Sequence, residues 1–211
     1  GLTIEDLASF WQAIAKEFST FKNIYGYGLM NEPHDLAPET KWFDMAQASI
    51  NAIREVDTNT LIMVGGNDWS SAERWIEQSD TLKFLKDPAN NLAFEAHVYF
   101  DKDASGTYKY SYEEEECYPE KGIDRVKPFV EWIKQNKFHG FIGEYGIPDN
   151  DPRWNETLDL FLGYLQENGI NGTYWAAGPW WDTYFMAITP KDGKDRPQMP
   201  IIEKYTSTLK K

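Results

Sequence analysis

Several kinds of residue and segment are scarce in this chain of 211 residues. A single cysteine, Cys117, excludes an intrachain disulfide. No run approaches the roughly 18 apolar residues of a membrane span, and no Pro, Gly or Ser tract marks a linker. Lys and Arg total 21 against 34 Asp and Glu, which gives a net charge of -13. Because this field repels phosphate backbones, we expect no nucleic-acid partner, and we expect no membrane association.

Metal and phosphate motifs are also missing from the sequence. No grouping of His, Cys and carboxylate residues has the spacing of metal ligands, so we expect no catalytic metal and no cofactor. No glycine-rich loop has the form that grips phosphate groups. The length suits one substantial core, and we expect residues 1–211 to form a single domain.

Aromatic residues, in contrast, are abundant, at 16% of the chain with nine Trp and twelve Tyr. Such rings can stack on the flat faces of sugars, or they can be large buried core residues. Composition alone leaves both uses open.

Two glutamates stand at the ends of strand-like segments. Glu32 lies in Asn31-Glu32-Pro33 after an apolar run from Ile24 to Met30, and Glu144 follows a second run that starts at Phe138. Either one alone is compatible with a solvated or salt-bridged residue at the start of a loop. Two in the same setting favour catalysis, because barrel enzymes place their catalytic groups at the ends of strands.

Apolar periodicity predicts five strands that alternate with helices. Helices are expected over 4–18, 38–56, 70–85, 123–136 and 200–209, and strands over 24–31, 61–64, 92–99, 138–144 and 170–176. A further helix is expected after the cap Asp151-Pro152, running through Leu158 and stopping at Gly169. Thr3 and Asp6 form a capping box before the first helix, and Pro128 is expected to delay or kink the fourth. Strands that alternate with helices form a parallel sheet with helical crossovers.

The strand ends carry a family resemblance. Asn31-Glu32-Pro33, His97-x-Tyr99, Glu144 and Trp175 resemble, in this order, the fourth, sixth, seventh and eighth strand ends of glycoside hydrolase family 5, the cellulase family. The resemblance runs from about residue 3 to the C-terminus. It implies an α/β fold, namely a portion of a TIM (β/α)8 barrel.

The resemblance also implies that part of the barrel is absent, because the family has about eight strands and five are expected here. Five strands cannot close such a barrel, and open edges would expose unpaired backbone groups. We therefore expect a catalytic-domain fragment completed by an N-terminal complement, which is a second chain, a cleaved segment that stays bound, or a second copy. The alternative is a rearranged five-stranded domain.

The resemblance assigns roles to the strand-end residues. Glu144 is the expected nucleophile and Glu32 the acid/base of a retaining glycosidase. Tyr99 is expected to direct its hydroxyl at Glu144, and His97 to bind substrate or Glu144, with a purely structural histidine as the alternative. Asn31 is expected to donate to the sugar 2-hydroxyl, or else to cap the following turn.

Trp175 resembles the aromatic floor beneath the sugar at the cleavage point. Four further tryptophans are expected in loops that follow strands, and about two of them are expected to contact substrate. These four are Trp69, Trp154, Trp180 and Trp181.

The resemblance favours a secreted endo-β-1,4-glucanase that acts on a β-linked polysaccharide. A β-mannanase or related β-glycanase has the same catalytic residues and remains open. Two hypotheses from other functional classes also remain. One is a non-catalytic carbohydrate-binding or scaffold chain, and the other is a barrel enzyme of unrelated chemistry such as a carboxylate-assisted isomerase.

Overall fold

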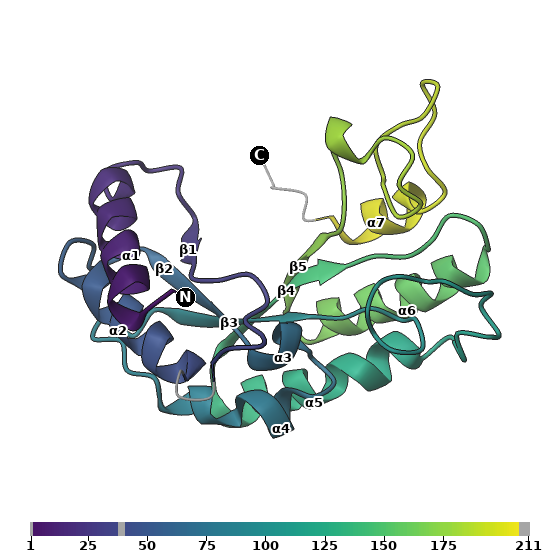
Figure 1. Ribbon diagram of the computed structural model, residues 1–211. Helices are drawn as coiled ribbons and strands as arrows, with labels where there is room; N and C mark the ends of the chain where they lie inside the picture. The colour runs from purple at the N-terminus through teal and green to yellow at the C-terminus, as the bar shows by residue number, and fades with distance from the viewer. Residues whose placement is uncertain (1, 38–40, 207–211) are drawn as a thin grey trace. The chain divides into compact units, whose positions relative to one another are not determined.

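The computed structural model describes residues 2–37 and 41–206. Its strands alternate with helices along the chain, which confirms the predicted order (Figure 1). The strands follow sequence order in one five-stranded sheet. They are β1 (Gly26–Gly28), β2 (Leu61–Gly65), β3 (Leu92–His97), β4 (His139–Tyr145) and β5 (Asn171–Tyr174).

The helices differ widely in length. They are α1 (Ile4–Phe18), α2 (Trp42–Arg54), α3 (Asn67–Ser70), α4 (Trp75–Ser79), α5 (Lys121–Asn136), α6 (Arg153–Glu167) and α7 (Met199–Tyr205), with 3-10 helices η1 (Asp80–Phe84) and η2 (Pro179–Trp181). Within the described residues, none of these helices is long and apolar enough to cross a membrane. The chain divides into a first unit, residues 1–96 and 131–141, and a second unit, residues 97–130 and 142–211.

The first unit is built on parallel strand pairing. Tyr27 of β1 lies opposite Ile62 of β2, and Met63 lies opposite Ala93 of β3. Helix α1 begins at the predicted capping box, in which the Asp6 backbone N–H donates to the Thr3 hydroxyl at 3.1 Å. Helices α1 and α2 pack side by side (Figure 1).

Large aromatic rings form much of the core of this unit. Phe94 of β3 lies 4.9 Å from Trp132 and 4.8 Å from Phe138, between ring centroids. Phe94 and Trp132 are both almost completely buried. Strand β3 is therefore packed into the core of this unit through Phe94.

A buried aspartate joins β1 to the turn that precedes β2. The Tyr27 hydroxyl donates to Asp57 at 2.8 Å, and Asp57 also accepts bonds from Thr60 and Asn59. Burial by itself would raise the pKa of Asp57, but these hydrogen bonds outweigh it and lower the pKa to about 2.

The second unit holds the ends of the later strands together through backbone bonds. The Val98 N–H donates to the Glu144 carbonyl at 3.0 Å, and the Trp175 N–H donates to the Tyr145 carbonyl at 2.8 Å. The core beneath these ends includes Phe161 of α6, whose ring lies 5.2 Å from that of Phe100. This packing places the residues after β3, β4 and β5 next to one another.

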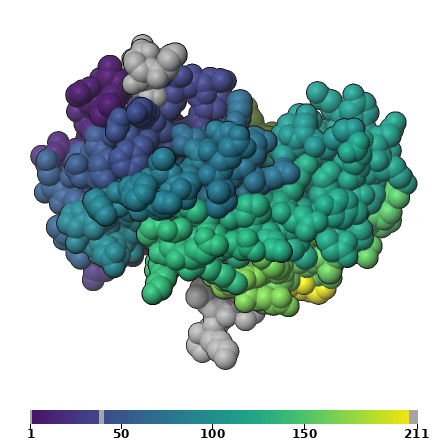
Figure 2. Space-filling view, turned by 90° about the horizontal axis from the view of Figure 1, so that it is seen from below, coloured from purple at the N-terminus to yellow at the C-terminus, as the bar shows by residue number. Residues whose placement is uncertain are grey.

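The acidic loop after β3 is ordered around a buried carboxylate. Asp101, which is completely buried, accepts bonds from the backbone N–H groups of Gly106, Thr107 and Tyr108. Figure 2 shows the outer side of this loop region as a broad teal surface. These hydrogen bonds to Asp101 therefore order the backbone inside the loop.

Several predicted boundaries were wrong or lie elsewhere. Helix α5 begins at Lys121, so Pro128 does not delay its start. The helix expected over 70–85 is divided into α4 and η1, with the short α3 before them. The start expected at Pro38 and the end expected at Leu209 fall outside the described residues, and α2 is assigned from Trp42.

Candidate active site

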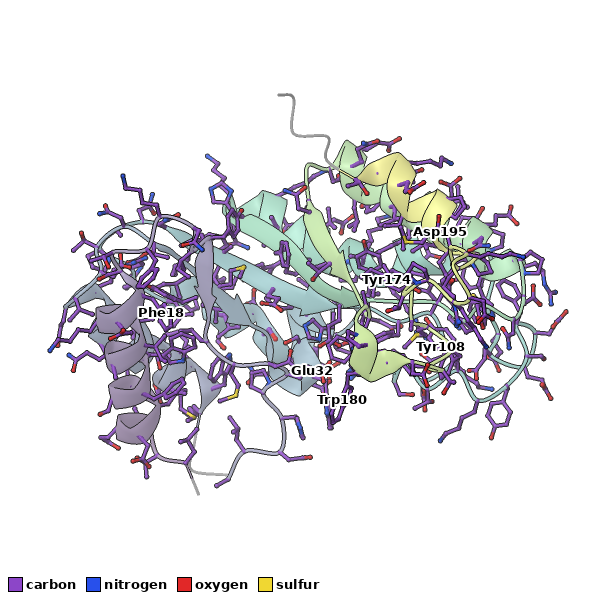
Figure 3. All side chains as sticks on the ribbon, turned by 90° about the horizontal axis from the view of Figure 1, so that it is seen from above. Phe18, Glu32, Tyr108, Tyr174, Trp180 and Asp195 are labelled. Atoms are coloured by element: carbon purple, nitrogen blue, oxygen red, sulfur yellow. The ribbon has the colours of Figure 1, made fainter. Side chains whose placement is uncertain are left out.

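Glu32 lies on the loop that leaves β1 (Figure 3). It is half-buried, and the adjacent Asn31 is exposed while Pro33 is buried. Glu32 has a φ of 45°, in the left-handed region that non-glycine residues seldom adopt. Such conformations cluster at functional sites, where the surrounding structure holds them.

Trp69 borders a pocket of the first unit. Its ring stacks on that of His34, with centroids 4.5 Å apart and planes 15° apart, and the residue remains 42% exposed. The pocket has a volume of about 440 Å³. It combines apolar and polar groups, among them Pro33, Phe43, Asn67, Asp68, Gln78 and Thr81.

Glu144 lies near the end of β4, among the strand ends of the second unit. The Tyr99 hydroxyl donates to Glu144 Oε2 at 2.8 Å, and His97 Nδ1 lies 3.7 Å from the same oxygen. The side chains of Glu144 and His97 are only 12% and 3% exposed. Burial, reinforced by the negative charge of Glu144, raises the pKa of Tyr99 far above its usual range. Tyr99 therefore keeps its proton and donates a hydrogen bond to the carboxylate.

Residues that the sequence did not single out hold Tyr99 in place. Arg125 of α5 donates to the Tyr99 carbonyl oxygen. Gly106 has a φ of 72°, and a Cβ there would lie 3.0 Å from the Tyr99 ring. The buried Tyr108 hydroxyl accepts from the Phe100 N–H and donates to the Gly146 carbonyl at 2.6 Å. These roles depend on contacts between residues that are separated in the sequence, so no local motif predicts them.

Trp175 follows β5 and belongs to an aromatic group. Its ring lies 4.9 Å from that of Trp181, and Trp181 lies 5.0 Å from Tyr184. Burial is the main cause that raises the pKa of Tyr184, and the charge of Glu144 adds to it. Sequence reasoning did not single out Tyr184, whose ring packs against Trp181 in this aromatic group. The aromatic run that begins at Trp180 was the available signal.

The remaining tryptophans lie in opposite environments. Trp180 is 90% exposed, and its side chain projects from η2 (Figure 3). Trp154 is 1% exposed and packs edge-on against Tyr108 and Tyr112, at 5.0 Å and 4.7 Å. The prediction of a loop position for Trp154 was wrong, because α6 begins at Arg153 and buries the ring. Trp154 is therefore a core residue and not a sugar-stacking surface.

Comparisons with known proteins bear on this arrangement. The family model described as cellulase (glycosyl hydrolase family 5) matches residues 2–180. Endo-beta-1,4-glucanase B of Emericella nidulans is 36% identical over 193 residues, which are 89% of this chain and 56% of that protein.

Solved structures are similar over almost the whole chain. The structure of Pseudomonas stutzeri endoglucanase Cel5A in complex with cellobiose has a TM-score of 0.89 and 42% identity, over 98% of this chain and 61% of the other. XacCel5A in complex with cellopentaose has a TM-score of 0.87 and 38% identity, over 97% of this chain and 66% of the other. The chain thus spans 56% of the Emericella protein and 61% of the Pseudomonas one.

Proposed function

Because the chain belongs to the cellulase family, glycosyl hydrolase family 5, we propose that it forms part of a retaining endo-β-1,4-glucanase. Its fold is the expected one, an α/β portion of a TIM (β/α)8 barrel. The observation that carries the proposal is the mostly buried carboxylate of Glu144, which receives a hydrogen bond from Tyr99. A carboxylate supported in this way can act as a nucleophile.

In the first step, a Glu144 oxygen attacks the anomeric carbon and forms a covalent glycosyl ester. The bond from that carbon to the leaving oxygen breaks, and protonated Glu32 gives its proton to this oxygen. Tyr99 donates to Glu144 and positions the attacking carboxylate. Asn31 is proposed to donate to the sugar 2-hydroxyl, an interaction that strengthens in the transition state.

In the second step, Glu32 acts as a base. It removes a proton from a water molecule, whose oxygen attacks the anomeric carbon and displaces Glu144. The product keeps the configuration of the substrate because the carbon is inverted twice. His97, close to Glu144, is proposed to help hold this carboxylate or the substrate.

The proposed substrate is a β-1,4-linked glucan. The names of the Emericella and Pseudomonas proteins support this choice, as does the exposure of Trp69 and Trp180 for stacking. Trp175 and Trp181 are proposed to bind the sugar near Glu144. Secretion of the enzyme is part of the proposal, because a long glucan chain outside the cell can be reached only by a secreted enzyme.

The test is hydrolysis of carboxymethylcellulose by the chain together with its N-terminal complement. Glu144→Gln should lower turnover roughly a thousandfold or more, whereas Glu120→Gln, at an exposed position of the same unit, should leave it unchanged. Unchanged turnover in Glu144→Gln would sink the proposal. Faster cleavage of mannan than of glucan would favour a β-mannanase, and binding without hydrolysis by the complete assembly would favour a carbohydrate-binding role.

We also propose that a strand and helix of an N-terminal barrel segment dock at the free side of β5. In the sheet order, β5 has one strand neighbour among the described residues. Beside it lies a groove of about 770 Å³. Its lining includes Thr173, Tyr174, Leu165, Ile202 and Tyr205. The relatives' additional length, beyond the part matched here, is the source proposed for that segment.

A further inference from the structure

The turn that carries Trp69 has an unusual backbone. Asp68, Trp69 and Ser70 have φ values of 54°, 56° and 55° in succession. Bulky residues rarely adopt this left-handed region, because the side chain crowds the following carbonyl group. Contacts from outside the turn must therefore hold it.

The start of the turn is fixed by buried neighbours. A Cβ at Gly66 would lie 2.4 Å from the Trp75 ring, so only glycine fits at this position. The Asn67 N–H donates to the Ser79 hydroxyl at 2.9 Å, and its side-chain amide donates to the Gln78 carbonyl at 2.8 Å. These contacts hold the residues before Trp69.

The other side of the turn depends on Arg74. Its guanidinium donates to the Asp68 carboxylate, and the two side chains are 39% and 24% exposed. This ion pair joins the residue just before Trp69 to the residue just before α4, so it closes the segment 68–74 on itself. Arg74 is not among the residues that line the 440 Å³ pocket. Any effect of Arg74 on a ligand there must act through the turn.

We propose that Arg74 is a positioning residue, which through Asp68 holds the Trp69 ring as the stacking surface for a glucose unit in this pocket. The inference rests on the proposed function and deepens it. The pocket offers what a sugar requires, namely a flat aromatic face together with amide and hydroxyl groups from Asn67, Gln78 and Thr81. His34 stacks on one side of Trp69 and supports the ring in that orientation.

A double-variant cycle tests the coupling, with cellopentaose as the probe and calorimetric titration of the full chain. Trp69→Ala should weaken binding roughly tenfold, as expected for loss of a principal aromatic contact, and Arg74→Met should weaken it several-fold. The double variant should bind no more weakly than Trp69→Ala alone, because Arg74 acts through the ring. Arg74→Lys, which keeps the charge, should recover part of the affinity.

A matched control is Arg153→Met, which breaks the Arg153–Asp151 ion pair of the second unit, whose side chains are 44% and 23% exposed and do not line the pocket. It should leave the affinity unchanged. Fully additive effects of Trp69→Ala and Arg74→Met, or an Arg74→Met variant with the affinity of the unmodified chain, would overturn the proposal.

A second readout needs neither sugar nor catalysis. The fluorescence emission lost in Trp69→Phe isolates the signal of Trp69. Arg74→Met should increase the quenching of that signal by acrylamide without lowering the cooperativity of unfolding. If cellopentaose binding and the coupling between Trp69 and Arg74 are intact but the assembled enzyme hydrolyses no glucan, the proposed function is rejected and this inference is kept. Failure of the unmodified chain to bind cellopentaose, or unchanged quenching, would reject the inference itself.

Discussion

At the scale of single residues, Tyr99 and Glu144 form a pair whose geometry explains its chemistry. Burial and the neighbouring negative charge keep the proton on the tyrosine, since both raise its pKa. The tyrosine therefore acts as a permanent donor to the carboxylate. A hydrogen bond to a charged acceptor contributes more than one between neutral groups.

Tyr99→Phe should lower kcat/KM of the assembled enzyme roughly 10- to 100-fold, because a hydrogen bond to a charged group contributes about 1.5–3 kcal/mol. The acid limb of the pH profile should also move to higher pH, since the charged carboxylate loses a donor. Tyr118→Phe is the matched control, because the Tyr118 hydroxyl donates to the exposed Asp124 instead. A pH profile and rate unchanged from those of the unmodified enzyme would contradict the role assigned to Tyr99.

Two tryptophans allow packing and substrate binding to be separated. Trp154→Ala should lower the free energy of unfolding by about 3–5 kcal/mol, because the ring is buried, whereas Trp180→Ala should change it by less than about 0.5 kcal/mol. Trp180→Ala should instead weaken cellopentaose binding several-fold. Urea unfolding and calorimetric titration of both variants provide the measurements, and the reverse pattern would refute the distinction.

At the scale of elements, local sequence rules were most successful where one segment controls its own structure. The Thr3 and Asp6 capping box begins α1 as predicted. Pro128 does not delay the start of α5, because the first turns of this helix are stabilised by more than local backbone preference. Lys121, at the start of this helix, is 7% exposed and donates to the Glu115 carbonyl oxygen at 2.8 Å. The preceding loop thus anchors the helix start, and that contact is invisible in the sequence.

The junction at Asp57 predicts an acid-dependent stability. Its carboxylate has a folded-state pKa of about 2 against an ordinary value of 3.8, so its contribution is complete above about pH 4 and is lost as pH falls towards 2. Asp57→Asn should therefore lower the free energy of unfolding by about 2 kcal/mol at pH 7 and by much less near pH 2. Urea unfolding across this range measures the difference.

Asp44→Asn serves as the control, because this aspartate is exposed in the first turn of α2. Its substitution should cost less than about 1 kcal/mol, through the helix dipole alone. A loss in Asp57→Asn that is equal at both pH values would show that the carboxylate charge is not the cause.

At the scale of the whole molecule, an N-terminal complement should change both the native mass and the activity of the protein. Addition of the N-terminal barrel segment of the Pseudomonas endoglucanase should raise the native mass above 24.5 kDa and restore hydrolysis. Ile202→Lys, which puts a charge into the groove beside β5, should weaken the association, whereas Glu203→Lys, at a neighbouring exposed position outside the groove lining, should not.

Sedimentation and activity measured together decide between the arrangements. A dimer that forms without the added segment would point to self-association. A stable monomer with full activity and sharp unfolding on its own would contradict the need for a complement and favour a rearranged five-stranded domain.

The order of strands and helices and the candidate residues at the strand ends were determined by the sequence alone. These depend on apolar periodicity, capping and short motifs, which act between residues close in the chain. Only the tertiary structure decided that Trp154 is buried, that Arg125 holds the Tyr99 carbonyl, and that Tyr184 belongs with Trp175. The physical reason is that burial and hydrogen-bond partners depend on residues far apart in sequence, whose proximity only packing creates.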